Sequence, residues 1–169
     1  LPADAKSILD VGCGNGAISN FISDRLVVGS DIALAAVKHM RHPACLADIG
    51  EMPFADGSFD LVMATDVLEH VPDSQYAKAC AEIARISRRW ILIAVPYREL
   101  LDSATVDCAA CGKLYHVHWH QRSYDEAFLG GHWSGIAPVS RWALAGERWI
   151  WTSQDRKSTR LNSSHSLPS

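Results

Sequence analysis

The sequence predicts a doubly wound α/β domain built on a mostly parallel sheet. Short apolar runs alternate with segments of helical periodicity, which is the pattern of parallel strands joined by crossover helices. Glycines follow the first apolar run, where a strand of such a sheet turns into a helix. The chain has 169 residues, of which 48% are hydrophobic, and this is enough for one buried core and one domain.

The strands are predicted from short apolar runs bounded by turn residues. The first run, "SILDVG", reads as a buried strand, and the fifth, "WILIAVP", is rich in β-branched residues and ends at a proline. A loop with Pro53, Asp56 and Gly57 separates the third strand from the fourth. The predicted strands are 7–12, 26–31, 44–48, 59–65 and 90–96.

Helices are predicted in the intervals between these strands. The spacing of apolar residues indicates helices over 17–25, 32–41 and 74–87. In the first of them, Ile18, Phe21 and Ile22 fall on one face. The third is amphipathic, with a narrow stripe of small residues that comprises Ala77, Cys80, Ala81 and Ala84.

After the fifth predicted strand the character of the chain changes. Residues 97–123 are rich in Cys, His and Tyr and carry no long periodic run, so we predict an inserted loop or a small subdomain. A helix is expected over 124–133, stopped near Gly130 and Gly131. Residues 139–154 alternate in polarity as a strand or hairpin does.

The last segment, 155–169, is polar and Ser-rich, and we do not expect it to join the fold. Its stretch "DRKSTRLNSSH" (155–165) matches one translated frame of a widely used sequencing adapter. We therefore predict a non-native disordered tail, with an ordinary disordered tail as the alternative. The domain is then expected at 1–154, with the natural chain continuing beyond about Gln154 and the fold truncated at both ends.

Composition excludes several classes of partner. A net charge of −3 gives no bulk attraction to nucleic acid or to anionic lipid. No apolar run reaches the roughly 18 residues that a membrane-spanning helix needs. The five cysteines are an odd number, which favours reduced thiols or metal ligands over a disulfide framework. We expect a soluble, cytoplasmic protein with no nucleic-acid partner, and the sequence does not indicate an oligomeric state.

The stretch "ILDVGCGNG" (8–16) places three glycines between a strand and a helix. Glycine lets the backbone turn sharply and lets a ligand approach closely, so Gly12, Gly14 and Gly16 indicate a nucleotide-like ligand. With Ala17 these residues also satisfy the dinucleotide fingerprint. Charge separates the two ligands, because Asp10 would repel a pyrophosphate but attract the ammonium and sulfonium of S-adenosylmethionine.

Two further acids stand at the ends of predicted strands. Asp31 closes the second strand and is positioned to accept hydrogen bonds from both hydroxyls of a ribose. Asp48 closes the third strand and can accept from the amino group of adenine, with Ile49 packing on the ring. Because the carboxyl ends of parallel strands meet at one edge of the sheet, Asp10, Asp31 and Asp48 are expected at one site.

These residues carry a family resemblance. The segments "ILDVGCGNG", "VVGSDIA", "LADIGEMPFADGSFDLVMATDVLEHV" and "ILIAVP" resemble the ordered motifs of class I S-adenosylmethionine-dependent methyltransferases of the type 11 branch, over about residues 7–96. The resemblance implies a Rossmann-like fold and methyl transfer to a small or medium acceptor. It implies that the donor is held by Asp10, Gly12, Gly14 and Gly16 around the methionine part, Asp31 and Ile32 at the ribose, Asp48 and Ile49 at the adenine, and Thr65 near the sulfonium.

The segment "ATDVLEHV" places polar residues at the mouth of this expected site. If Asp66 opens a helical turn, then Asp66, Glu69 and His70 share one face, and the run is similar to an acid-x-x-Glu-His metal site of some methyltransferases. We favour the simpler interpretation, in which His70 lines the pocket without a metal. Its imidazole titrates near neutral pH and is the candidate general base or substrate-orienting group.

A Cys/His cluster follows in "CAACGKLYHVHWHQ". Cys108 and Cys111 have the spacing of a zinc knuckle, and His116 and His120 could complete a tetrahedral site. The alternative is a metal-free loop whose histidines face the acceptor pocket. The spacing is tighter than that of a DNA-reading finger and no basic recognition helix follows, so we infer no nucleic-acid binding. In either case the segment is expected to shape acceptor choice.

Two other functions stay open at this stage. An NAD-dependent oxidoreductase is disfavoured by Asp10, by Asp48 and by the lack of a hydride-site signature such as Tyr-x3-Lys. A non-catalytic binding module would keep the sheet and use the Cys/His loop for a partner. No motif indicates whether an oxygen, nitrogen or carbon atom would be methylated.

Overall fold

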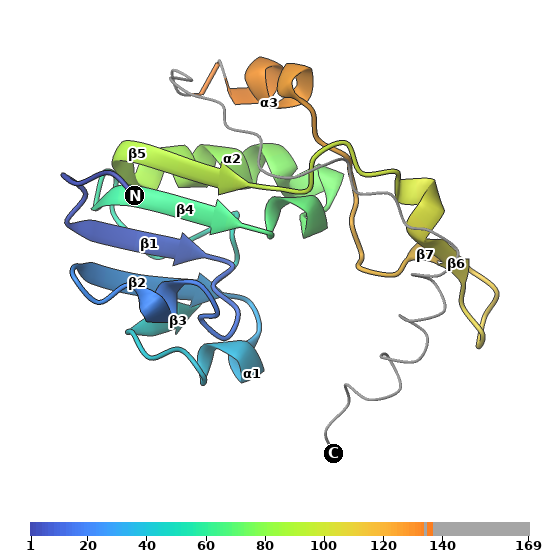
Figure 1. Ribbon diagram of the computed structural model, residues 1–169, viewed down its shortest axis with the longest axis horizontal. Coiled ribbons are helices and arrows are strands. Elements are labelled where there is room, and N and C mark those ends of the chain that lie inside the picture. The colour runs from blue at the N-terminus through green and yellow to red at the C-terminus, as the bar shows by residue number, and fades with distance from the viewer. Residues whose placement is uncertain (134, 137–169) are drawn as a thin grey trace.

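A computed structural model describes residues 1–133, 135 and 136, so the predicted strand at 139–154 and the tail at 155–169 lie outside the described residues. Five strands form one sheet in which every neighbouring pair is parallel, in the order β3-β2-β1-β4-β5 (Figure 1). This order reverses between β1 and β4, as in doubly wound folds. The strands are β1 Ser7–Val11, β2 Leu26–Asp31, β3 Ala44–Leu46, β4 Phe59–Thr65 and β5 Ser87–Ala94.

The predicted strands are confirmed, with differences at their ends. β2 and β4 span the predicted residues, and β1 and β3 are shorter by one and two residues. β5 begins three residues before the predicted start and ends at Ala94. It starts early because helix α2 ends at Ile86 and the chain passes directly into the strand, through the polar residues Ser87, Arg88 and Arg89.

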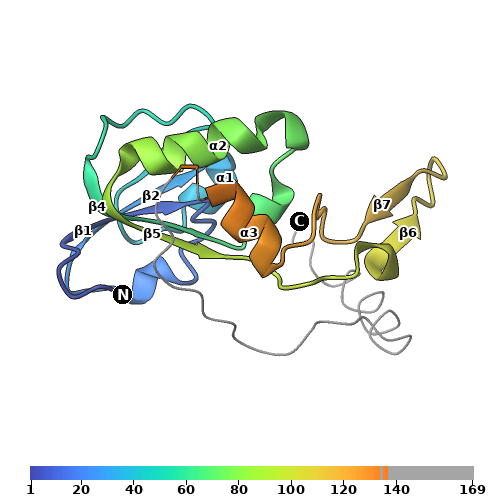
Figure 2. The same ribbon diagram turned by 90° about the horizontal axis from the view of Figure 1, so that it is seen from above.

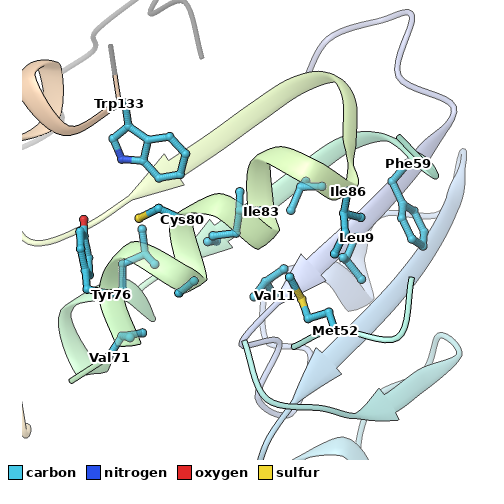
Figure 3. Packing of buried hydrophobic residues seen from close by; sticks show 14 of the residues in the cluster. Leu9, Val11, Met52, Phe59, Val71, Tyr76, Cys80, Ile83, Ile86 and Trp133 are labelled. Carbon is cyan, nitrogen blue, oxygen red and sulfur yellow. The ribbon is translucent and has the colours of Figure 1, made fainter. Parts of the chain in front are cut away.

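Helix α2 (Asp73–Ile86) lies along one face of the sheet (Figure 2). The predicted stripe of small residues does not form the buried face of the helix. Of its four members only Cys80 is fully buried, and Ala77 and Ala81 are exposed. The helix instead turns its bulkier apolar residues inward, which removes more apolar surface from water. Figure 3 shows Ile83 and Ile86 facing Leu9 and Val11 of β1. The buried residues of the helix are Tyr76, Ala79, Cys80, Ile83 and Ile86.

The two helices predicted over 17–25 and 32–41 are largely absent. Residues 17–25 contain only a 3-10 turn, η1 Ser19–Phe21, and Phe21 is 85% exposed. Between Ala17 and Arg25 the segment consists of Ile, Ser, Asn, Phe and Asp, all weak helix formers, so no turn beyond this one is stabilised. Residues 32–41 contain only α1 (Leu34–Val37). The spacing of apolar residues therefore predicted both helices to be longer than they are.

Beyond β5 the chain forms a 3-10 turn, η3 Leu101–Ala104, and an antiparallel hairpin of β6 (Thr105–Asp107) and β7 (Leu114–His116). The hairpin projects past the carboxyl end of β5 in both ribbon views. Helix α3 (Glu126–Trp133) follows, so the helix predicted over 124–133 is confirmed with a start two residues later, and it includes Gly130 and Gly131. Trp133 reaches back to the core beside Cys80 (Figure 3).

Among the described residues, no helix has the length and apolar character that crossing a bilayer would require.

Candidate functional site

A cavity of about 180 Å³ opens at the carboxyl ends of β1, β2 and β3, beside the point where the strand order reverses. Ligands of doubly wound folds bind at this place. The structure brings together six of the predicted site residues there, from four separate segments. The lining comprises Val11, Gly12, Ser30, Asp31, Ile32, Ala47, Asp48, Ile49, Val67, His70, Val71, Pro72 and Gln75.

A larger and shallower hollow of about 710 Å³ lies between the residues after β5 and the start of α3. None of the predicted donor-site residues lines it. Asp10, Gly14, Gly16 and Thr65 also lie outside the lining of the smaller cavity. The smaller cavity is therefore the candidate site, and these four predicted residues do not line it.

The glycine-rich turn is held by close packing at Gly12. Its φ of 67° lies in the left-handed region, and a Cβ at this position would stand 2.3 Å from Cγ2 of Val67. Its N–H donates to the carbonyl of Ser30 at 2.7 Å. Any side chain here would displace Val67, which lines the cavity, so the position requires glycine.

Asp31 ties the end of β2 to the glycine-rich turn. One carboxylate oxygen accepts the N–H of Gly14 at 2.8 Å, and the other accepts the N–H of Ala33 at 2.8 Å. A carboxylate oxygen has two lone pairs, so both can accept a further hydroxyl from the cavity. Asp48 is fixed in a similar way, because its Oδ1 accepts the N–H of Gly50 at 2.7 Å.

Asp10 is buried in β1 beneath the turn, with 2% of its surface exposed. Burial raises the pKa of its carboxyl to about 6, a hydrogen bond from Ser19 acts in the opposite sense, and the nearby charge of Asp31 raises it further. Its Oδ1 has no hydrogen-bond partner within the described part of the chain. Such a carboxyl ionises more readily when a cation binds close by.

The turn after β4 does not present the predicted triplet on one face. Asp66 is exposed with a φ of 52°, whereas Glu69 in the 3-10 turn η2 (Leu68–His70) is buried. Burial raises the pKa of Glu69 to about 7. His70 lines the cavity, and burial, followed by the proximity of His120, lowers its pKa.

The predicted zinc ligands are not assembled. Strand pairing sets Thr105 opposite His116, so the cysteines occupy the tip of the hairpin and His116 its base. Three residues of extended strand separate the two positions by about 10 Å. The candidate ligand groups found among the described residues contain histidines and glutamates, with no cysteine. Cys108 accepts hydrogen bonds from the backbone of Ala110 and Cys111, which lowers its pKa.

Two buried charged residues near the candidate site were missed by sequence reasoning. Arg122 is buried and donates to the carbonyls of Leu68 and Val71 at 2.6 and 2.5 Å and to Asp73 at 2.6 Å, so it fixes the turn that carries His70. Glu99 is 3% exposed and contacts two histidines of the following segment. Both are single charged residues in non-periodic sequence, where no local pattern signals burial.

Comparison with known proteins identifies relatives of the sheet region. A family model described as a methyltransferase domain matches residues 9–90. An uncharacterised protein of Methanocaldococcus jannaschii is 42% identical over 81 residues, which cover 47% of this chain and 35% of the relative. A chloroplastic tocopherol O-methyltransferase of Arabidopsis thaliana is 31% identical over 110 residues, covering 56% of this chain and 32% of the relative. The chain thus spans about a third of the length of these relatives.

A solved structure with the same fold is that of a SAM-dependent methyltransferase from Methanosarcina mazei. It aligns with a TM-score of 0.63 and 18% identity, and the alignment covers 80% of each chain. The predicted doubly wound, mostly parallel architecture is confirmed by this similarity and by the strand order.

Proposed function

We propose that this chain, which belongs to the class I S-adenosylmethionine-dependent methyltransferases, binds S-adenosylmethionine in the cavity at the ends of β1, β2 and β3. The complete protein would transfer its methyl group to a small or medium acceptor molecule. The observation that carries the proposal is the convergence of Gly12, Asp31 and Asp48 on one cavity from three successive strands.

Each end of the donor has a chemically suitable partner. Asp31 offers free lone pairs on both carboxylate oxygens, which suits the two hydroxyls of a ribose. Asp48, with Ile49 and Ile32 as apolar walls, suits an adenine ring and its amino group. The methionine part would extend over Gly12, Gly14 and Gly16, with Thr65 toward the sulfonium.

Asp10 supplies negative charge beneath the turn that would hold the methionine part. Its carboxyl is half-ionised near pH 6 in the free protein, because burial raises its pKa. The positive charges of the donor would favour its ionised form, and a dinucleotide pyrophosphate would oppose it. This charge preference supports a sulfonium donor over a nicotinamide dinucleotide.

Methyl transfer from a sulfonium is a displacement that depends mainly on alignment of the acceptor and exclusion of water. His70 lines the cavity and would orient an acceptor, and Arg122 fixes the turn that carries it. The Arabidopsis relative is named an O-methyltransferase of tocopherol, which favours a hydroxylated small molecule as acceptor for this chain too.

A calorimetric titration of the full chain with S-adenosylhomocysteine and with NAD tests the proposal. We expect one site for S-adenosylhomocysteine with a Kd of micromolar order, about −8 kcal/mol, and no heat of binding for NAD. Binding of NAD without binding of S-adenosylhomocysteine would reject the proposal. Circular dichroism of the same sample establishes that the titrated chain is folded.

A further inference from the structure

Three polar side chains converge at one edge of the donor cavity. Glu69 and His70 come from the turn after β4, and His120 comes from the segment that follows the hairpin. One donor atom from each lies within 4.8 Å of the others. The rings of His70 and His120 meet edge to face, with centroids 4.9 Å apart. Side chains distant in sequence therefore face one small volume.

The ring of His120 is oriented by a buried carboxylate. Its Nδ1 lies 2.5 Å from Oε2 of Glu99, and the two side chains are 8% and 1% exposed. A carboxylate accepts a hydrogen bond, so Nδ1 carries the proton and Nε2 keeps a lone pair. Because Glu99 occupies Nδ1, Nε2 is the nitrogen available toward Glu69 and His70. Histidines that bind metal ions have this carboxylate partner behind the ring.

His116 lies beside Glu99, and its ring is oriented by the backbone of its own segment. Its Nε2 lies 3.5 Å from Oε1 of Glu99, and its Nδ1 accepts the backbone N–H groups of His118 and His120 at 3.3 Å. A ring that accepts at Nδ1 carries its proton at Nε2, so His116 offers no lone pair to an ion at Glu99. This separates His116 from the ligand group centred on Glu69, His70 and His120.

One buried oxygen among these three side chains has no hydrogen-bond partner in the described part of the chain. Glu69 is 1% exposed, and its Oε2 has no hydrogen-bond partner among the residues that the structure describes. A buried carboxylate oxygen without a partner is costly, because it has lost its hydration. Within the same described residues, the side-chain contacts recorded for Glu99 are with the rings of His116 and His120. Two buried carboxylates beside imidazoles make this volume suitable for a cation.

We propose that Glu69, His70 and His120 bind one divalent transition-metal ion, and that Glu99 is the outer residue that orients His120. Two imidazoles and one carboxylate are a ligand set of zinc and of other first-row divalent metals, whereas Mg²⁺ and Ca²⁺ prefer oxygen ligands alone. This set differs from both sets suggested by the sequence. It omits Asp66, and it takes His120 away from Cys108 and Cys111.

The ion would join two segments that border the site. The turn after β4 and the segment after the hairpin already touch through the N–H of Gln121, which donates to the carbonyl of Glu69 at 2.7 Å. A shared ion would fix the position of His70 at the cavity wall. In relation to the proposed function, the ion would lie on the acceptor side and could polarise an acceptor oxygen. Binding of the metal itself does not depend on the donor.

The experiment measures Zn²⁺ bound by the full chain after metal removal, by chelator competition and elemental analysis. We expect one equivalent in the unmodified protein. Glu69→Gln, His70→Asn and His120→Asn should each weaken Zn²⁺ binding at least 100-fold, and Glu99→Gln roughly 10- to 100-fold, as for other outer carboxylates. The double variant Cys108→Ser, Cys111→Ser should bind Zn²⁺ as the unmodified protein does. The same is expected of the control His42→Asn, because His42 contacts the carbonyl of Ser19 and belongs to no candidate ligand group found among the described residues.

Several results would overturn the proposal. These are absence of Zn²⁺ binding, loss of binding in the cysteine variant, or loss with Glu99→Gln and His116→Asn but not with Glu69→Gln. If a ligand variant does not fold, the spectrum of the Co²⁺-loaded unmodified protein decides, since thiolate charge transfer would contradict a nitrogen and oxygen ligand set. A parallel titration with S-adenosylhomocysteine, with and without metal, tests the donor site alone, so the two proposals can fail separately.

Discussion

Replacing Asp31 by alanine isolates the contact that joins β2, the glycine-rich turn and the proposed ribose site. The side chain accepts two backbone N–H groups at 2.8 Å, from Gly14 and Ala33, and would accept ribose hydroxyls with its remaining lone pairs. A hydrogen bond to a charged group contributes about 1.5–3 kcal/mol. We therefore expect Asp31→Ala to weaken S-adenosylhomocysteine binding by about 1.5–3 kcal/mol, or roughly 10- to 150-fold.

The assay is calorimetric titration of Asp31→Ala beside the control Asp24→Ala. Asp24 forms an exposed ion pair with Arg25 at 2.5 Å, of a kind worth about 0–1 kcal/mol, and lies away from the cavity lining. We expect the control to bind the ligand as the unmodified chain does. Unchanged affinity in a cooperatively folded Asp31→Ala variant would refute a role for Asp31 in donor binding.

Three further predictions concern the framework of the site. Denaturant unfolding of two glycine variants tests the packing of the turn. Gly12→Ala should lower the free energy of unfolding by about 2–4 kcal/mol, because its Cβ would overlap Val67. Gly14→Ala has open space around its Cβ and should lower it by about 1–2 kcal/mol. Asp10 has a pKa raised from 3.8 to about 6 in the folded chain, so its destabilising effect is absent below about pH 4 and complete above about pH 6. Ionisation of the buried Asp10 should therefore lower the free energy of unfolding by about 3 kcal/mol between pH 4 and pH 7. Asp10→Asn should not show this decrease. If the variant and the unmodified chain lose the same free energy of unfolding over this range, the raised pKa of Asp10 is contradicted. Arg122→Ala should lower the free energy of unfolding by about 2–4 kcal/mol, because the contacts with Leu68, Val71 and Asp73 are lost. The control Arg98→Ala removes an exposed arginine and should cost about 0–1 kcal/mol. Equal effects of the two substitutions would contradict the proposed anchoring by Arg122.

The central strands β1 and β4 could be predicted because nearly all of their residues are buried, so that they read as continuous apolar runs. "LVVGSD" and "FDLVMAT" gave the bounds of β2 and β4 correctly. Asp31 and Asp48 could be expected at one cavity because the carboxyl ends of parallel strands lie at the same edge of the sheet. The helices between the first strands were overstated. Ile18 and Phe21 have helical spacing, but the structure leaves both exposed, so spacing carried no information about burial there.

The segment after β5 could not be resolved from its sequence. Spacing between Cys108 and His120 suggested a shared metal, but the hairpin register separates the cysteines from His116. The contacts of His120 with Glu99 and His70 span long sequence separations, and no local period encodes such contacts. The same applies to Arg122, whose partners lie about fifty residues earlier in the chain.

The central claim is that the cavity at the ends of β1, β2 and β3 is the methyl-donor site. A crystal structure of the chain with S-adenosylhomocysteine tests it most directly. We predict the ribose hydroxyls on the Asp31 carboxylate, the adenine between Ile32 and Ile49 with its amino group toward Asp48, and the amino-acid part over the turn above Asp10. A ligand bound in the hollow beside α3, or one seated in the cavity without contact to Asp31, would contradict the account.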